Sequence, residues 1–177
     1  DSSAEAAAFD QRRATGDPRT SRPAPDNRAK VSRLPQQALV YQVLDGTRVD
    51  MLVLPVEGKG LWSTLYGYLA LDGADLRQVR GIAFYEHGET PGLGGEIDNP
   101  KWRAKWAGRR ALDDGLRPVL SVRKGPAGAP ADDPYHVDGL SGATITSNGV
   151  TELVRFWLGE DGFGPYLTRY AKAGGGR

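Results

Sequence analysis

Apolar positions along the middle of the chain fall into short runs that are separated by glycine-containing turns, a pattern typical of strands. Two such runs occupy 38–54 and flank the dipeptide Asp45-Gly46, which is a strong signal for a hairpin. Further runs rich in strand-forming residues lie at 63–71, 79–87 and 117–125. The pattern therefore predicts several strands, at least two of them antiparallel.

Helical spacing of apolar residues appears later, in 147–159, with Ser147 or Asn148 as the expected N-cap and Gly159 as the stop. The residues that share its apolar face are Val150, Leu153, Val154 and Trp157. Shorter helices are predicted at 100–108 and 164–174. Strands early in the chain, with helices interspersed and late, predict an α+β fold. We expect a single domain with a mostly antiparallel sheet flanked by helices.

Residues 1–36 differ from the rest because they are proline-rich and charged and offer almost nothing to bury. One short helix is predicted near their start. We therefore expect 1–36 to form an N-terminal arm or linker and 37–172 to form the compact domain.

The composition and charge of the chain argue against several classes of function. The 177 residues suit one domain, and 23 basic against 22 acidic residues give a net charge of +1, which makes no electrostatic case for nucleic acid. The absence of cysteine excludes disulfides and thiolate-held metal or iron–sulfur centres. No apolar run approaches the roughly 20 residues that span a bilayer. The sequence shows no clustered ligand set for a metal or sodium ion.

The stretch DGLSGATITSNG (138–149) combines small hydroxyl side chains with a flexible backbone, directly before the predicted helix. A helix N-terminus with unpaired N–H groups favours an anion such as phosphate. The same composition is also common in a loop that only caps its helix. A hydrolase with a hydroxyl nucleophile is a third interpretation, but the chain has only two histidines, His87 and His136, in no assignable triad order.

Two earlier stretches also contain residues that could contact a ligand. In EHGETPGLGGEIDNP (86–100), the turn Thr90-Pro91-Gly92 holds Leu93 between glycines, where a flat apolar ligand could lie. An ordinary hairpin loop is the alternative. Glu86 and Glu89 could form an acid–base pair or a metal site. Without further ligands nearby in the sequence, we interpret them as solvated loop carboxylates. In GKGLWSTLYGYLAL (58–71), Trp62 is either a core residue or a ring presented to a pocket.

The segments 58–71, 86–106 and 137–150 occur in this order in the NqrC family, a subunit family of Na+-translocating NADH:quinone oxidoreductases. The chain resembles the soluble FMN-binding domain of that family over roughly residues 37–170. The G subunit of the Rnf complex shares the ETPGLG and SGAT elements and is the alternative family. The elements GLWSTLYG and DNPKW favour NqrC. A domain that binds FMN reversibly, outside such a complex, is a further alternative.

The resemblance implies FMN attached covalently, by a phosphoester, to the Thr144 side chain. It also implies a separate flavin transferase that takes FMN from FAD and recognises the motif that begins at Asp138. The residues expected to line the flavin site are Trp62, Ser63, Glu89, Thr90, Leu93, Gly94, Leu140, Ser141, Gly142, Ala143 and Thr146. The phosphate would meet the Ser141 and Thr146 hydroxyls and the amides of 142–147. We expect Thr144 to lie opposite an apolar wall from the earlier turns.

The function implied is that of an electron carrier in a membrane-bound complex that couples NADH oxidation by ubiquinone to sodium transport. The isolated domain would show no turnover, because the flavin performs the redox chemistry. Its partners would be the other subunits of the complex. Members of the family carry one N-terminal transmembrane helix, which this sequence lacks. The expected location is the outer, periplasmic face of the bacterial cytoplasmic membrane.

Overall fold

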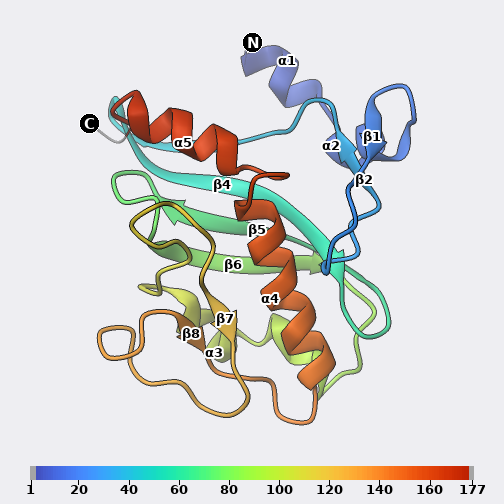
Figure 1. Cartoon of the computed structure of the whole chain (residues 1–177), viewed down its shortest axis with the longest axis vertical. Coiled ribbons are helices and arrows are strands. Elements are labelled where there is room, and N and C mark those ends of the chain that lie inside the picture. Colours follow the sequence, from blue (N-terminus) through green and yellow to red (C-terminus); the bar gives the residue numbers. More distant parts are fainter. Residues whose placement is uncertain (1–2, 176–177) are drawn as a thin grey trace.

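The computed structural model describes residues 3–175, and its centre is a four-stranded antiparallel sheet in the order β3-β4-β5-β6 (Figure 1). The strands are β3 (Tyr41–Asp45), β4 (Arg48–Lys59), β5 (Thr64–Asp72) and β6 (Val79–Glu86). β3 and β4 form the predicted hairpin, in which Gly46 adopts a φ of 62°. The α+β class and the mostly antiparallel sheet are confirmed.

One face of this sheet is buried under helix α4 (Thr144–Leu158), which crosses it diagonally in Figure 1. Buried and less buried residues alternate along β4, so that Leu52, Leu54 and Val56 all face the core. The predicted apolar face of the helix meets them through Val150, Leu153, Val154 and Trp157. Each such side chain contributes roughly 1.5–3 kcal/mol by leaving water.

Helix α4 begins at Thr144, three residues before the predicted start at Ser147. Ser147 is not the N-cap, because its hydroxyl accepts a hydrogen bond from the Leu140 amide (3.1 Å) within the first turns of the helix. The N-cap is Ala143, so the hydroxyls of Thr144 and Thr146 belong to the helix and not to the loop before it.

The remaining elements lie on the same side of the sheet as α4 and at the ends of the sheet. They are the 3-10 turn η1 (Gly94–Asp98), α3 (Pro100–Arg103), the 3-10 turn η2 (Ala104–Trp106), β7 (Ser121–Val122), β8 (His136–Val137) and α5 (Gly164–Lys172). The predicted helix at 100–108 is correct in place, although its second half is a 3-10 turn. The strand predicted at 117–125 shortens to β7, which pairs in parallel with β8. Among residues 3–175, no helix combines the length and the apolar character that a membrane crossing requires.

The segment before residue 37 is more structured than the sequence predicts. It forms α1 (Ser3–Ala8), α2 (Gln11–Gly16) and the hairpin of β1 (Ser21–Pro23) with β2 (Arg33–Pro35). Ala29, Val31 and Leu34 are buried in the main core, so the expectation that this segment has almost nothing to bury is wrong. Asn27 folds the loop inward, because its side chain bonds both the amide and the carbonyl of Val31. The division of the chain at residue 36 stays a prediction.

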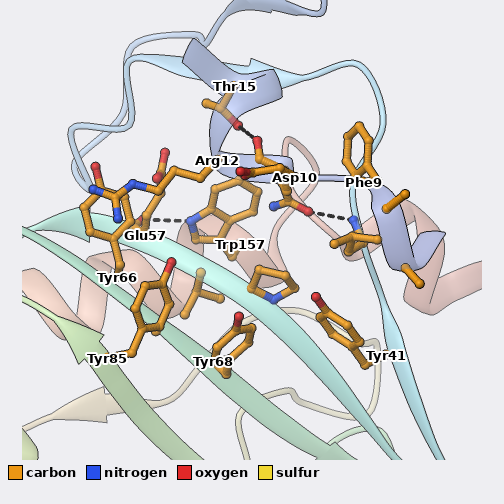
Figure 2. Close-up of a pocket in the computed structure, with 17 residues that line it drawn as sticks. Phe9, Asp10, Arg12, Thr15, Tyr41, Glu57, Tyr66, Tyr68, Tyr85 and Trp157 are labelled. Atoms are coloured by element: carbon orange, nitrogen blue, oxygen red, sulfur yellow. Dashed lines mark hydrogen bonds between the residues drawn. The ribbon is translucent and has the colours of Figure 1, made fainter. Parts of the chain in front are cut away.

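Helix α2 lies over the other face of the sheet, beside a cavity of about 320 Å³ (Figure 2). The Arg12 guanidinium lies 3.8 Å from the Tyr66 ring centroid and donates two hydrogen bonds to the Glu86 carboxylate (2.6 and 2.9 Å). Tyr68 and Tyr85 extend the aromatic surface next to Tyr66, as Figure 2 shows. Arg12 therefore attaches the first two helices to the sheet.

We expect Arg12→Ala to loosen α1 and α2 without unfolding the domain. The ion pair is half exposed and screened by water, so its loss costs little stability, and the cation–π contact adds a similarly small contribution. Limited chymotrypsin cleavage at Phe9 should accelerate several-fold, while the thermal midpoint falls by only a few degrees. Arg13→Ala, one position further along the same helix, is the control. Equal cleavage rates in the two variants would contradict this role of Arg12.

Candidate functional site

The three sequence stretches that carry candidate chemistry meet at the N-terminal end of α4, around one carboxylate. The Thr146 hydroxyl donates to Glu89 Oε2 (2.6 Å), and so does the Leu61 amide (3.0 Å). The amides of Trp62 and Ser63 donate to Glu89 Oε1 (2.9 and 3.1 Å). Residues 26 to 57 positions apart in the sequence thus share one acceptor group.

Glu89 is only 5% exposed, yet its carboxylate is ionised at neutral pH. Burial by itself raises the pKa of Glu89. The hydrogen bonds from the Thr146 hydroxyl and from the three backbone amides outweigh that effect, and they leave the pKa below its ordinary value. The Ser63 hydroxyl also donates to this carboxylate (3.2 Å), so the buried charge is well satisfied.

A tight turn carries the segment after Glu89 back against α4. The Thr90 carbonyl accepts from the amides of Leu93 (3.1 Å) and Gly95 (2.8 Å), and Gly92 has a φ of 77°. This is the turn predicted from Thr90-Pro91-Gly92. A Cβ on Gly94 would lie 2.5 Å from Thr146 Oγ1 and 2.9 Å from Glu89 Oε2, so only glycine permits this close approach.

Thr144 is exposed at the first position of α4, and no side chain of the described residues caps this helix. The first amides of a helix have no partner within it, so they are free to meet an anion. A groove of about 550 Å³ runs beside Thr144, a volume within the range of ligand pockets, which is roughly 300–1,000 Å³. Arg123 and Lys124 line it and add positive charge.

Large apolar side chains are exposed on the same segments. Trp62 is 66% exposed and Leu93 is 44% exposed, so Trp62 is presented at the surface and is not a core residue. Leu93 Cδ2 lies 3.0 Å from the position that a Cβ on Gly142 would take, which places it against the loop before Thr144. Leu61 and Ile145 are also exposed. Sequence reasoning missed both, although each directly adjoins a predicted site residue, Trp62 or Thr144.

The other motif residues divide between surface and interior. Ser141 and Gly142 are exposed, whereas Leu140 and Ala143 are buried. The Thr146 hydroxyl is engaged by Glu89, and the side chain is 1% exposed.

Asp138 is held within the fold. Its carboxylate forms an ion pair with Lys105 and accepts the Ala127 amide (3.1 Å), while its carbonyl accepts the Trp102 indole N–H (2.8 Å). Burial raises the pKa of Asp138, but the Lys105 and Ala127 contacts outweigh that effect and leave the pKa below its ordinary value. Recognition of Asp138 by a flavin transferase stays a prediction.

The contacts of the two histidines give no support to a hydrolase. His87 Nε2 pairs with Asp98 and His136 Nδ1 pairs with Asp133, each at 2.6 Å. Within residues 3–175, no hydrogen bond joins either ring to a serine or threonine hydroxyl. The same part of the chain holds no group of three His, Asp or Glu side chains placed to bind a metal ion.

Comparison with known proteins finds relatives that share the region of this site. A family model described as the FMN-binding domain matches residues 60–159. The NqrC subunit of the Na(+)-translocating NADH-quinone reductase of Vibrio anguillarum is 46% identical over 172 residues, which cover 96% of this chain and 66% of that protein. The corresponding subunit of Pseudomonas aeruginosa is 48% identical over 169 residues, which cover 93% and 64%. The chain thus spans slightly less than two thirds of the length of these curated relatives. The crystal structure of Shewanella oneidensis NqrC matches with a TM-score of 0.89 at 36% identity, covering 97% of this chain and 78% of that one.

Proposed function

Because the chain belongs to the FMN-binding domain family and, within it, to the NqrC family of Na(+)-translocating NADH-quinone reductases, we propose that it is an electron-carrying domain with FMN esterified to Thr144. The observation that carries this proposal is the position of Thr144. Its hydroxyl is exposed at an uncapped helix N-terminus, beside a groove with two cations.

The donor set fits the phosphate of a flavin mononucleotide. An esterified phosphate keeps one negative charge, which backbone amides at a helix N-terminus and nearby cations stabilise. The first-turn amides of α4 supply the former, and Arg123 and Lys124 supply the latter. The Ser141 hydroxyl, exposed in the loop before the helix, is a further donor. The Thr146 hydroxyl is already bonded to Glu89, so it supports the site from behind.

An apolar wall for the flavin ring is present on the neighbouring segments. Trp62 and Leu93 expose large apolar surfaces, which an aromatic ring would cover with exclusion of water. When bound, FMN supplies the one- and two-electron chemistry that no side chain of this chain provides. The residues of the chain bind and orient the group, and they exclude water from one side of it.

Attachment requires a second protein. Thr144 Oγ would form an ester bond to the flavin-side phosphorus of FAD, the bond between the two phosphates would break, and AMP would leave. The hydroxyl proton would pass to a base of the flavin transferase, because within the described residues neither histidine ring is hydrogen-bonded to the Thr144 hydroxyl.

In this proposal the domain is part of a Na(+)-translocating NADH-quinone reductase in the bacterial cytoplasmic membrane. The other subunits of that complex are its partners in electron transfer. An anchor that holds the domain at this membrane is part of the proposal, on the strength of its membership of the NqrC family. Sodium movement is assigned to the complex and not to this domain.

Production of the chain with and without a flavin transferase tests the proposal. With the transferase, we expect a mass higher by one FMN moiety and a yellow pellet after acid precipitation. Without it, the pellet should be colourless. Flavin that appears only in the supernatant would replace this proposal with reversible FMN binding. A colourless protein of unchanged mass, obtained with an active transferase, would overturn it.

A further inference from the structure

We infer that Glu89, with Thr146 as its partner, is a positioning residue that fixes the backbone of Trp62 beside the first turn of α4 and does not itself contact the flavin. This inference rests on the proposed function, because it assigns a role to residues beneath the same site. The segment concerned, 60–63, connects β4 to β5 and is called the strap below.

Three consecutive backbone amides of the strap share one acceptor group. The amides of Leu61, Trp62 and Ser63 all donate to the Glu89 carboxylate, at 2.9 to 3.1 Å. The Gly60 amide donates to the Ser63 carbonyl (2.8 Å) and closes the turn, and Lys59 Nζ donates to the Trp62 carbonyl (3.3 Å). Without Glu89, three consecutive amides of an irregular segment would lose their acceptor, so the backbone that carries the Trp62 ring depends on this side chain.

Glu89 is itself fixed at its backbone. The Glu89 amide donates to His87 Nδ1 (3.1 Å), and the neighbouring Gly88 amide donates to Ser63 Oγ (2.7 Å). The carboxylate therefore extends from a rigid segment at the end of β6 into the space between the strap and α4.

The link to the helix runs through Thr146. Its hydroxyl donates to the same Oε2 atom that accepts the Leu61 amide, and Thr146 lies two residues after Thr144. Both Glu89 and Thr146 are buried, at 5% and 1% exposed. Neither side chain is at the surface, where a flavin on Thr144 would lie. Each acts through a neighbour: Glu89 through Trp62, and Thr146 through the helical turn that begins at Thr144.

Three substitutions separate this role from simple stability. Glu89→Gln replaces one acceptor oxygen by an NH2 group, which cannot accept the strap amides on its side. Thr146→Val keeps the shape and removes the hydroxyl donor. Thr146→Ser keeps the donor and should restore the wild-type behaviour. Glu96→Gln, the same chemical change in the adjacent 3-10 turn, is the matched control, because its carboxylate accepts a hydrogen bond from Asn99 Nδ2 (2.7 Å), away from the strap.

The first measurement uses the protein without flavin. In hydrogen exchange resolved to single amides, Glu89→Gln should accelerate exchange at least tenfold, relative to Glu96→Gln, at those amides of residues 61–63 that face its NH2 group. Exchange in the core of β5 should stay within twofold. An acceleration at 61–63 of less than twofold would overturn the inference, whatever the outcome for the flavin.

The second measurement follows pH. The folded pKa of Glu89 is lowered, so the ionised carboxylate stabilises the fold above the unfolded value of 4.5, and that contribution is lost as the pH falls through the folded pKa. The difference in thermal midpoint between wild type and Glu89→Gln should therefore be constant from pH 7 to about 5 and shrink below 4.5. The neighbouring His87, whose ring accepts the Glu89 amide, is present in both proteins. A constant difference down to the lowest pH at which both fold would contradict the inference.

The third measurement uses flavin-loaded protein. A tryptophan ring in contact with a flavin quenches its emission, so Glu89→Gln and Thr146→Val should each increase the flavin emission several-fold, and Thr146→Ser should not. Unchanged emission in Glu89→Gln would overturn the assigned role. If wild type takes up no flavin, the proposed function fails, and the exchange and pH measurements still decide the role of Glu89.

Discussion

Thr144→Ala is expected to reduce covalent flavin to an undetectable level while the domain remains folded. Alanine has no oxygen to esterify, so the loss at this position is complete. Thr144 is exposed at the first position of α4, and alanine is a better helix former than threonine. The free energy of unfolding should therefore change by no more than about 0.5 kcal/mol. Mass spectrometry of protein produced with the transferase measures the flavin, and thermal unfolding measures the fold.

Two variants complete the Thr144 experiment. Ser141→Ala removes an exposed hydroxyl from the same loop and should keep covalent flavin in most molecules, because that hydroxyl only adds a donor. Thr144→Ser keeps a hydroxyl at the attachment point and should retain some flavin. Covalent flavin in Thr144→Ala at the wild-type level would show that another residue carries it.

Gly149→Ala is expected to lower the thermal midpoint by roughly 4–8 °C and to disturb the flavin site, although alanine favours helices. The exchange alone would stabilise an exposed helix by about 1 kcal/mol. A Cβ on Gly149, however, would overlap the Lys59 carbonyl oxygen and lie 3.3 Å from Gly60 Cα. Both obstacles are backbone atoms, so α4 must move away from the strap. Such overpacking typically costs about 1–3 kcal/mol or more, and here it exceeds the gain from helix propensity.

The control for this prediction is Gly81→Ala in β6, where a Cβ would meet nothing within 4 Å. Its thermal midpoint should stay within about 2 °C of wild type. Hydrogen exchange at 61–63 should rise in Gly149→Ala and not in Gly81→Ala, because only the former displaces the strap. A Gly149→Ala protein as stable as wild type would mean that the helix and the strap do not touch as described.

Local patterns predicted the sheet and the apolar face of α4, because these depend on the periodicity of neighbouring residues. The hairpin at Asp45-Gly46 and the face that includes Leu153 are examples. The start of α4 was not predicted, since Ser147 looks like an N-cap but bonds a loop amide from inside the helix. The burial of Val31 was not predicted either, because a polar residue, Asn27, directs it inward.

The candidate site shows the same limit. The motif around Thr144 and the turn after Glu89 can be read from the sequence, since each depends on adjacent residues. The function of Glu89 cannot, because its five donors come from residues at least 26 positions away. A carboxylate next to a predicted turn resembles a solvated loop residue until the fold shows which amides surround it.

The uneven burial of the tryptophans gives this domain a native optical reporter. Trp102, Trp106 and Trp157 are at most 6% exposed, whereas Trp62 is 66% exposed. A neutral quencher dissolved in the buffer, such as acrylamide, reaches the indole of Trp62 and leaves the other three largely bright. Any docking protein that covers this surface should remove the quenchable fraction of the ultraviolet emission, so association can be titrated without a label.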